Sequence, residues 1–383
     1  MMVRFARGAA VSAGLLLIAG FGAGSLDARA QEITIGVTLG ATGQTASIGI
    51  PMKQGAEVLP QKIGDVTVRY IFLDDGGDPG VAVKNMRQLT EQNQADVILG
   101  SSSIPSCTAM AEVALQTKTP QICLSPSRTN AFSFAMAQPA ALMVEGMVEN
   151  MHAKGYKNIG YIGFADSLGE HNLSSMQRLM EPLGMKLVAS ERYNRTDTSV
   201  TAQVLKIVAA KPDAIFVSAS GTPAALPQLE LVQRNYKGQV YFLHGVINRD
   251  FLRVGGKSLE GVIATAGPFA VAAELPDSNP IKAEALKFTK VYNDKFGANS
   301  VNTFAAYSWD AFKVLSAAVP VALKTAKPGT PEFRVALRDA MQNNPDIVGA
   351  NGIYKMTATD HNGLDKRARV MVTVKGNAFH PLP

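Results

Sequence analysis

Short apolar runs alternate with stretches of helical spacing along most of this chain, and the alternation comes in two similar series. Residues 96–103 (DVILGSSS) and 213–220 (DAIFVSAS) each contain an aspartate, an apolar run and serines at its end. Each leads through a helical pattern to another short strand with a polar end, CLSPS in one series and FLHGV in the other. Strands alternating with helices predict parallel sheets, so the repetition predicts two similar α/β lobes.

The other expected elements keep this order. In the first series we expect strands at 33–39, 67–75, 96–99 and 121–124, with helices near 52–60 and 80–94. A helical pattern starting at Pro139 precedes the second series. There we expect strands at 158–164, 187–193, 213–220, 239–245 and 261–266, with helices at 170–183, 199–210 and 223–235.

After Pro268 the pattern becomes mainly helical, with long stretches at 279–296, 302–323 and 332–341 and one late strand at 369–374. We interpret these helices as a return to the first lobe, so that the chain crosses between lobes more than once. The predicted division is 31–137 plus 269–349 for lobe 1 and 138–268 plus 350–383 for lobe 2. Multiple crossings make a hinge, and the cleft between the lobes becomes the expected ligand site.

The first thirty residues have the features of a signal peptide. Arg4 and Arg7 precede an apolar stretch at 9–21, and Ala28-Arg29-Ala30 matches a cleavage site before Gln31. The stretch contains no cysteine for lipid attachment and is short for a membrane span. We therefore predict an exported, soluble, periplasmic protein that is not a lipoprotein.

Charge and cysteine content narrow the function classes. The formal net charge is +6, and removal of the first thirty residues, which hold three arginines and one aspartate, leaves +4 without a basic run. This is not the charge pattern of a nucleic-acid-binding protein.

The cysteines, Cys107 and Cys123, fall at one end of the predicted sheet. An oxidising compartment permits a disulfide between them, but the sequence cannot test its geometry. His, Cys, Asp and Glu do not cluster at metal-ligand spacing, so no metal or cofactor is expected.

Serines gather where two neighbouring strands of the first series end, at 101–103 and at 125–127. Ligands of open α/β sheets bind outside the carboxyl ends of the strands. A helix beginning there offers unpaired N–H groups that suit an anion. The hypothesis is a carboxylate site at 101–103 and 125–129, and the alternative is that the serines only cap the helix and form turns.

Enzyme motifs that would be recognisable are absent from the sequence. There is no G-x-S-x-G elbow and no H-E-x-x-H, and no G-x-G-x-x-G follows a strand after residue 30. His244 ends a strand that should face the cleft, but a catalytic Ser–His pair would need a nucleophile motif. We therefore predict a binding protein and not an enzyme.

Four blocks in this order resemble the periplasmic substrate-binding proteins of branched-chain amino acid ABC transporters. They are ITIGVTLGATGQTASIG, LDDGGDPGVAVKNMRQL, ILGSSSIPS with TPQICLSPS, and IGYIGFADSLGE. The resemblance implies a type I periplasmic binding protein, a Venus-flytrap fold of two Rossmann-like lobes joined by a multi-strand hinge. It also implies a monomer that captures a solute and delivers it to membrane permease and ATPase subunits without performing chemistry.

The resemblance assigns site residues in both lobes. In the family, hydroxyls and backbone N–H groups of the first lobe hold the ligand carboxylate. The matching residues here are Ser102, Ser103, Ser125, Ser127 and Thr129. The second lobe of the family supplies a carboxylate for the ligand's amino group, but this chain has His244 at that place. Asp166 could meet an amine instead, and Thr222 stands near a position that is aromatic in branched-chain amino acid binders.

These site residues are compatible with two classes of ligand, an amino acid and an aromatic or aliphatic acid without an amine. The second class ranks slightly ahead because an ammonium group buried without a carboxylate partner is costly. An alternative function is a soluble periplasmic protein that presents its ligand to a sensory or regulatory system, because one fold can serve several functions.

Overall fold

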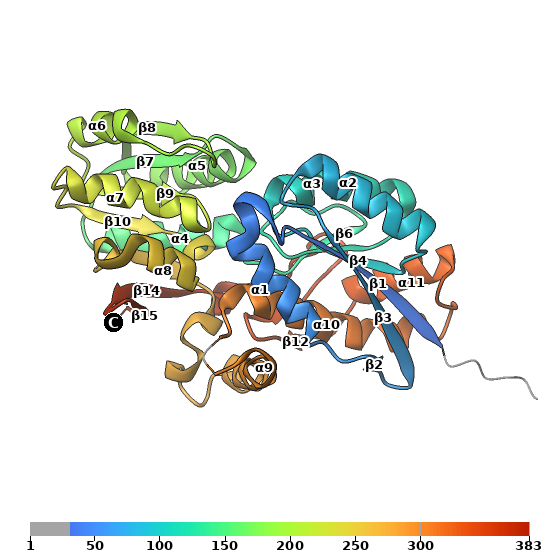
Figure 1. Cartoon of the computed structure of the whole chain (residues 1–383). Helices are drawn as coiled ribbons and strands as arrows, with labels where there is room; N and C mark the ends of the chain where they lie inside the picture. The colour runs from blue at the N-terminus through green and yellow to red at the C-terminus, as the bar shows by residue number, and fades with distance from the viewer. Residues whose placement is uncertain (1–30, 299, 383) are drawn as a thin grey trace, which may run out of the picture.

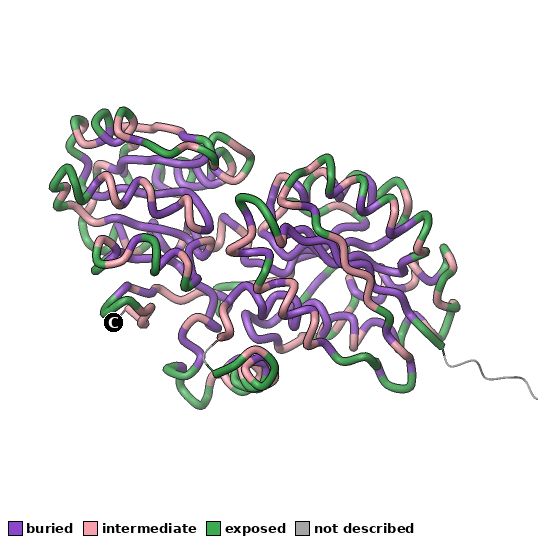
Figure 2. The backbone as a smooth tube through the Cα atoms, viewed as in Figure 1, coloured by how far each residue is buried: buried purple, intermediate pink, exposed green. Residues whose placement is uncertain are grey.

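The computed structural model describes residues 31–298 and 300–382, which form two α/β lobes beside each other (Figure 1). The predicted signal peptide lies outside the described residues. Each lobe is built on one sheet of mostly parallel strands flanked by helices, which confirms the predicted fold class. The strands form the buried centre of each lobe, and exposed residues concentrate on helices and loops (Figure 2). Within the described residues, no helix is both long enough and apolar enough to cross a bilayer.

The first sheet has the strand order β2-β3-β1-β4-β5-β6. Its strands are β1 (Glu32–Leu39), β2 (Lys62–Ile63), β3 (Val66–Asp74), β4 (Val97–Leu99), β5 (Gln121–Cys123) and β6 (Ser133–Ala135). Neighbours pair in parallel except for β2 with β3. Along β4, Val97 and Leu99 enter one hydrophobic core and Ile98 enters another, because successive side chains point to opposite faces. Burial on both faces explains the continuous apolar run of this strand.

Helices cover both faces of this sheet. On one face lie α1 (Ala46–Glu57), α9 (Pro280–Phe296), α10 (Thr303–Ala322) and α11 (Pro331–Gln342), and on the other lie α2 (Pro79–Arg87) and α3 (Ile104–Thr117). The return of the C-terminal helices to the first lobe is therefore observed. The predicted start of the first helix near residue 52 is wrong, because α1 begins at Ala46 and continues through Pro51. Burial of Ile48 and Met52 in the core outweighs the hydrogen bond that proline removes.

The second sheet has the order β15-β14-β11-β10-β9-β7-β8. Its strands are β7 (Asn158–Phe164), β8 (Lys186–Tyr193), β9 (Ala214–Ser218), β10 (Gln239–Phe242), β11 (Ile263–Ala266), β14 (Val370–Lys375) and β15 (Ala378–Pro381). Its helices are α4 (Ala140–Ala153), α5 (Ser167–Met180), α6 (Thr201–Ala209), α7 (Ala225–Gln233) and α8 (Arg249–Gly255). The strand β15 is not anticipated by the sequence pattern, and it pairs antiparallel with β14 at the edge of the sheet.

Three segments connect the two sheets. The first leads from β6 to α4, the second leaves β11 at Ala266, and the third runs from the hairpin of β12 (Ile347–Val348) and β13 (Ile353–Tyr354) to β14. The observed topology thus has several crossings between lobes. The precise lobe boundaries stay a prediction.

Candidate functional site

A cavity lies between the lobes, at the carboxyl ends of β4 and β5 in one sheet and of β9 and β10 in the other. The cavity is partly open to solvent. Its polar lining consists of Thr45, Ser102, Ser103, Ser125, Asn172, Arg195, Ser220, His244 and Tyr307. Its apolar lining includes Ile48, Met52, Ile104, Leu124, Leu168, Leu243 and Phe304.

The serines of the first lobe differ in what their hydroxyl groups already bind. Ser103 caps α3 and donates its hydroxyl to Ser106 Oγ at 2.8 Å. Ser102 Oγ accepts the backbone N–H of Gly40 at 3.0 Å, which leaves its own proton free to donate. Ser125 is 5% exposed, and its hydroxyl forms no hydrogen bond to any described residue. Ser102 and Ser125 are therefore the first-lobe serines of the cavity whose hydroxyl protons are available to a ligand.

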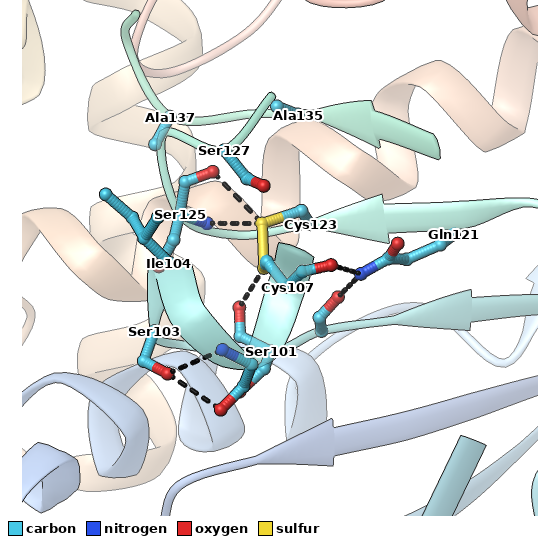
Figure 3. The surroundings of a disulfide bond; sticks show 12 residues. Ser101, Ser103, Ile104, Cys107, Gln121, Cys123, Ser125, Ser127, Ala135 and Ala137 are labelled. Carbon is cyan, nitrogen blue, oxygen red and sulfur yellow. Dashed lines mark hydrogen bonds between the residues drawn. A yellow bond between two sulfur atoms is a disulfide. The ribbon is translucent and has the colours of Figure 1, made fainter. Parts of the chain in front are cut away.

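A disulfide ties these two serine segments together (Figure 3). Cys107 lies in the first turn of α3 and Cys123 ends β5, and their Cα atoms are 5.8 Å apart. Beside the bridge, Gln121 Nε2 donates to the carbonyl oxygens of Gly100 and Cys107 at 3.0 and 3.2 Å. The start of α3 and the end of β5 are thereby held in one rigid unit.

Asp75 supports the first serine segment from behind. Its carboxylate accepts the hydroxyl of Ser101 at 2.8 Å, the hydroxyl of Thr38 at 3.1 Å and the backbone N–H of Gly77 at 2.8 Å. Burial raises the pKa of Asp75, and these hydrogen bonds oppose the rise. Asp75 does not line the cavity, so its role is to hold the loop.

Arg195 is the only charged side chain among the described residues that line the cavity. Its Nε donates to Asp166 Oδ2 at 2.7 Å, one Nη donates to Ser220 Oγ at 3.3 Å, and the guanidinium lies 4.2 Å from the ring centre of Phe164. Asp166 also caps α5, accepting the backbone N–H groups of Leu168 and Gly169. Asp166 therefore orients Arg195 and is not part of the cavity wall.

His244 lines the cavity from the second lobe, directly after β10. It is 5% exposed, and its Nδ1 is buried without a hydrogen-bond partner among the described residues. Burial lowers the pKa of His244 to about 4, so the ring is neutral at neutral pH. His244 thus offers a neutral polar group and no positive charge.

The structure brings four of the predicted residues to the cavity, namely Ser102, Ser103, Ser125 and His244. The other four do not line it. Ser127 lies near Thr108, with 3.4 Å between their hydroxyl oxygens, and Thr129 is exposed. Thr222 begins a short 3-10 helix after β9, and Asp166 binds Arg195. The ligand-binding roles of all eight stay predictions.

Several lining residues were missed from the sequence. Arg195 follows the carboxyl end of β8. A polar residue just after a predicted strand is a candidate for the cavity, so the sequence pattern could have indicated it. Thr45 lies in the polar turn after the first strand, which was also recognisable. Tyr307 lies inside α10, where nothing in the local pattern separates a cavity residue from a core residue.

A family model described as "Periplasmic binding protein" matches residues 32–378. An extracellular ligand-binding receptor from Rhodopseudomonas palustris HaA2 is 44% identical, with a TM-score of 0.90 over 92% of this chain and 100% of that chain. The Leu/Ile/Val-binding protein homolog 3 of Brucella melitensis is 23% identical over 299 residues, 74% of this chain and 78% of that protein.

A further similar structure is an ABC transporter solute-binding protein from R. palustris, solved in complex with benzoate. It is 18% identical, with a TM-score of 0.78 over 92% of this chain and 95% of that chain. At this identity the likeness shows a shared fold.

Proposed function

This chain belongs to the periplasmic binding protein family, and on that premise we propose that it is the solute-binding component of an ABC importer. It captures a small carboxylate that lacks an ammonium group, in the cavity between the lobes. In this proposal the protein is exported to the periplasm by its signal peptide, acts as a monomer, and delivers the solute to permease and ATPase subunits.

The charge of the cavity wall carries the choice of ligand class. Arg195 contributes a guanidinium whose Nε is paired with Asp166 and whose other N–H groups can donate, and no aspartate or glutamate of the described residues lines the cavity. The ammonium of an amino acid would lose its hydration there without gaining a carboxylate partner, which is strongly unfavourable. An anion would instead meet a guanidinium, which is a strong hydrogen-bond donor to carboxylates.

The carboxylate end is proposed to lie against Ser102 and Ser125. Both hydroxyls are available as donors, and the first turn of the 14-residue helix α3 begins beside them. Backbone N–H groups of a helix start and its dipole favour a negative charge. Together these groups would replace the water that a carboxylate loses on entering the cavity.

The body of the solute is proposed to be apolar. Met52, Leu168 and Phe304 contribute apolar surface to the cavity, together with other aliphatic side chains. Such a lining suits an aromatic or aliphatic chain and contributes through burial of apolar area. The similar structure from R. palustris, solved in complex with benzoate, supports this choice of ligand class.

The test is a thermal-shift screen of the purified chain starting at Gln31. One panel contains amine-free carboxylic acids, such as benzoate and hexanoate, and the other contains the matching amino acids. A solute that binds only the folded protein raises the melting temperature by mass action. We expect stabilisation by amine-free acids only. Stabilisation by aliphatic amino acids alone would refute the proposed ligand class.

A further inference from the structure

The three segments that join the two sheets meet at one buried polar cluster. Gln138 belongs to the first segment and donates Nε2 to the carbonyl oxygen of Asn351 in the third segment at 3.2 Å. Both residues are 0% exposed. Gly267 belongs to the second segment, and a Cβ atom added to it would lie 2.5 Å from Gln138 Nε2. All three segments between the lobes therefore contact one another at this cluster, which we call the hinge cluster.

The hinge cluster is bonded directly to the wall of the cavity. Tyr307 lines the cavity from α10, and its hydroxyl donates to Gln138 Oε1 at 2.6 Å. Tyr307 is 0% exposed, so this bond is shielded from solvent. A continuous path of hydrogen bonds thus runs from the cavity through Tyr307 and Gln138 to Asn351.

The same helix also fixes the third segment. Asp310, one turn after Tyr307 in α10, accepts the backbone N–H groups of Ala350 at 2.5 Å and Asn351 at 3.0 Å. The hydroxyl of Tyr354 lies 2.9 Å from Asp310 Oδ2 and 2.9 Å from the carbonyl oxygen of Met136, which belongs to the first segment. The helix α10 is thus bonded to the third segment through Asp310 and to the first segment through Tyr307. The Tyr307–Gln138 bond therefore depends on how the first and third segments lie relative to each other.

We propose that Tyr307 and Gln138 are positioning residues that couple occupancy of the cavity to closure of the hinge. A solute packed against the Tyr307 ring restrains the ring, and the restrained hydroxyl holds Gln138 on Asn351. The arrangement of the first and third segments seen here, with the lobes in contact, is stabilised as a result. This inference rests on the proposed function, because it assumes a solute in the cavity.

The chain offers a matched control for this bond. Tyr292 on α9 is also buried, and its hydroxyl donates to Gln54 Oε1 at 2.6 Å. This second tyrosine–glutamine pair has the same chemistry and distance, but Gln54 lies in α1 and neither residue lines the cavity. Tyr292→Phe therefore removes an equivalent bond without touching the hinge cluster.

The experiment compares Tyr307→Phe, Gln138→Met, the double variant and Tyr292→Phe. Gln138 does not line the cavity, so Gln138→Met removes no side chain that would contact the solute directly. The readouts are the affinity for benzoate by calorimetry and the radius of gyration by X-ray scattering, without and with benzoate. Closure lowers the radius of gyration, whereas loss of general stability does not change the shape of the folded molecule.

We expect each hinge variant to bind benzoate about tenfold more weakly, since a buried acceptor or donor loses its partner. The double variant should be no weaker than the weaker single variant, and the hinge variants should have larger radii of gyration than Tyr292→Phe. Additive losses in the double variant, or radii equal to that of Tyr292→Phe, would overturn the coupling. If benzoate does not bind the parent, the comparison is made with the most stabilising acid of the thermal-shift screen. Absence of stabilisation by every acid of the screen would refute the proposed function, whereas equal radii of the hinge variants and Tyr292→Phe with a bound acid would refute the coupling alone.

Discussion

Ser47 Oγ lies so close to Gly221 that a side chain on Gly221 would not fit: an added Cβ atom would be 2.9 Å from this oxygen. Ser47 belongs to α1 in the first lobe, and Gly221 follows β9 in the second. The lobes therefore touch at this point, beside the cavity. Gly221 also has a φ of +65°, a conformation that glycine adopts without strain.

Gly221→Ala is expected to weaken solute binding about tenfold, because overpacking at the contact disfavours the closed arrangement. Calorimetry with the most stabilising acid of the screen measures the effect. In Ser47→Ala/Gly221→Ala the nearest remaining atoms given are Ile48 Cδ1 and Pro223 Cδ at 3.7 Å, so the part of the loss that the contact causes should be recovered, and the part caused by backbone strain at Gly221 should stay. Failure to recover would mean that backbone strain at Gly221 and not the contact causes the loss.

Ser125→Ala is expected to lower the affinity for a carboxylate about ten- to a hundredfold, since a hydrogen bond to a charged group contributes about 1.5–3 kcal/mol. Ser127→Ala is the matched control, two residues away and outside the cavity. Titration calorimetry of both variants checks the difference. Equal losses in the two variants would place the carboxylate elsewhere.

Arg195→Met is expected to reduce carboxylate binding by about ten- to a hundredfold and to leave binding of the corresponding neutral amide nearly unchanged. Arg192→Met is the control, because Arg192 pairs with Glu170 on the surface and does not line the cavity. Competition assays with benzoate and benzamide give the comparison. If Arg195→Met affects acid and amide equally, Arg195 contributes packing and not charge recognition.

His244 is expected to make stability depend on pH on the acid side. Its pKa is lowered from 6.5 to about 4 in the folded protein, so the unfolded chain binds the proton more readily. This contribution to the free energy of unfolding is complete above pH 6.5 and is lost as the pH falls toward 4, by about 3 kcal/mol in total. Urea unfolding of the parent and His244→Gln at pH 7.5 and 4.5 measures it. Equal losses in both proteins would contradict the assignment.

Removal of the disulfide in Cys107→Ala/Cys123→Ala is expected to lower the free energy of unfolding by about 3 kcal/mol, given the sequence separation of 16 residues. Because the bridge holds the segments that carry Ser102 and Ser125, solute affinity should fall as well. Urea unfolding and calorimetry report the two effects separately. A loss below about 1 kcal/mol would show that the loop is already restrained without the bridge.

The alternation of strands and helices, the two similar series and a serine cap before the helix that follows residues 96–103 could all be predicted from the sequence. These features depend on side-chain periodicity and on hydrogen bonds between residues close in the chain. The same local reasoning placed Ser102, Ser125 and His244 at strand ends, and parallel strands bring their carboxyl ends to one edge of a sheet. The structure places all three at the cavity.

Only the tertiary structure decided which polar side chains face the cavity. Asp166 and Arg195 are brought together because β7 pairs with β8. Asp166, predicted to bind an amine of the solute, therefore binds the guanidinium of Arg195 instead. Gln138 and Tyr307 meet across 169 residues because α10 packs on the first lobe. A side chain's direction and its distant partners follow from sheet register and helix packing, and these depend on the whole core, not on the local sequence.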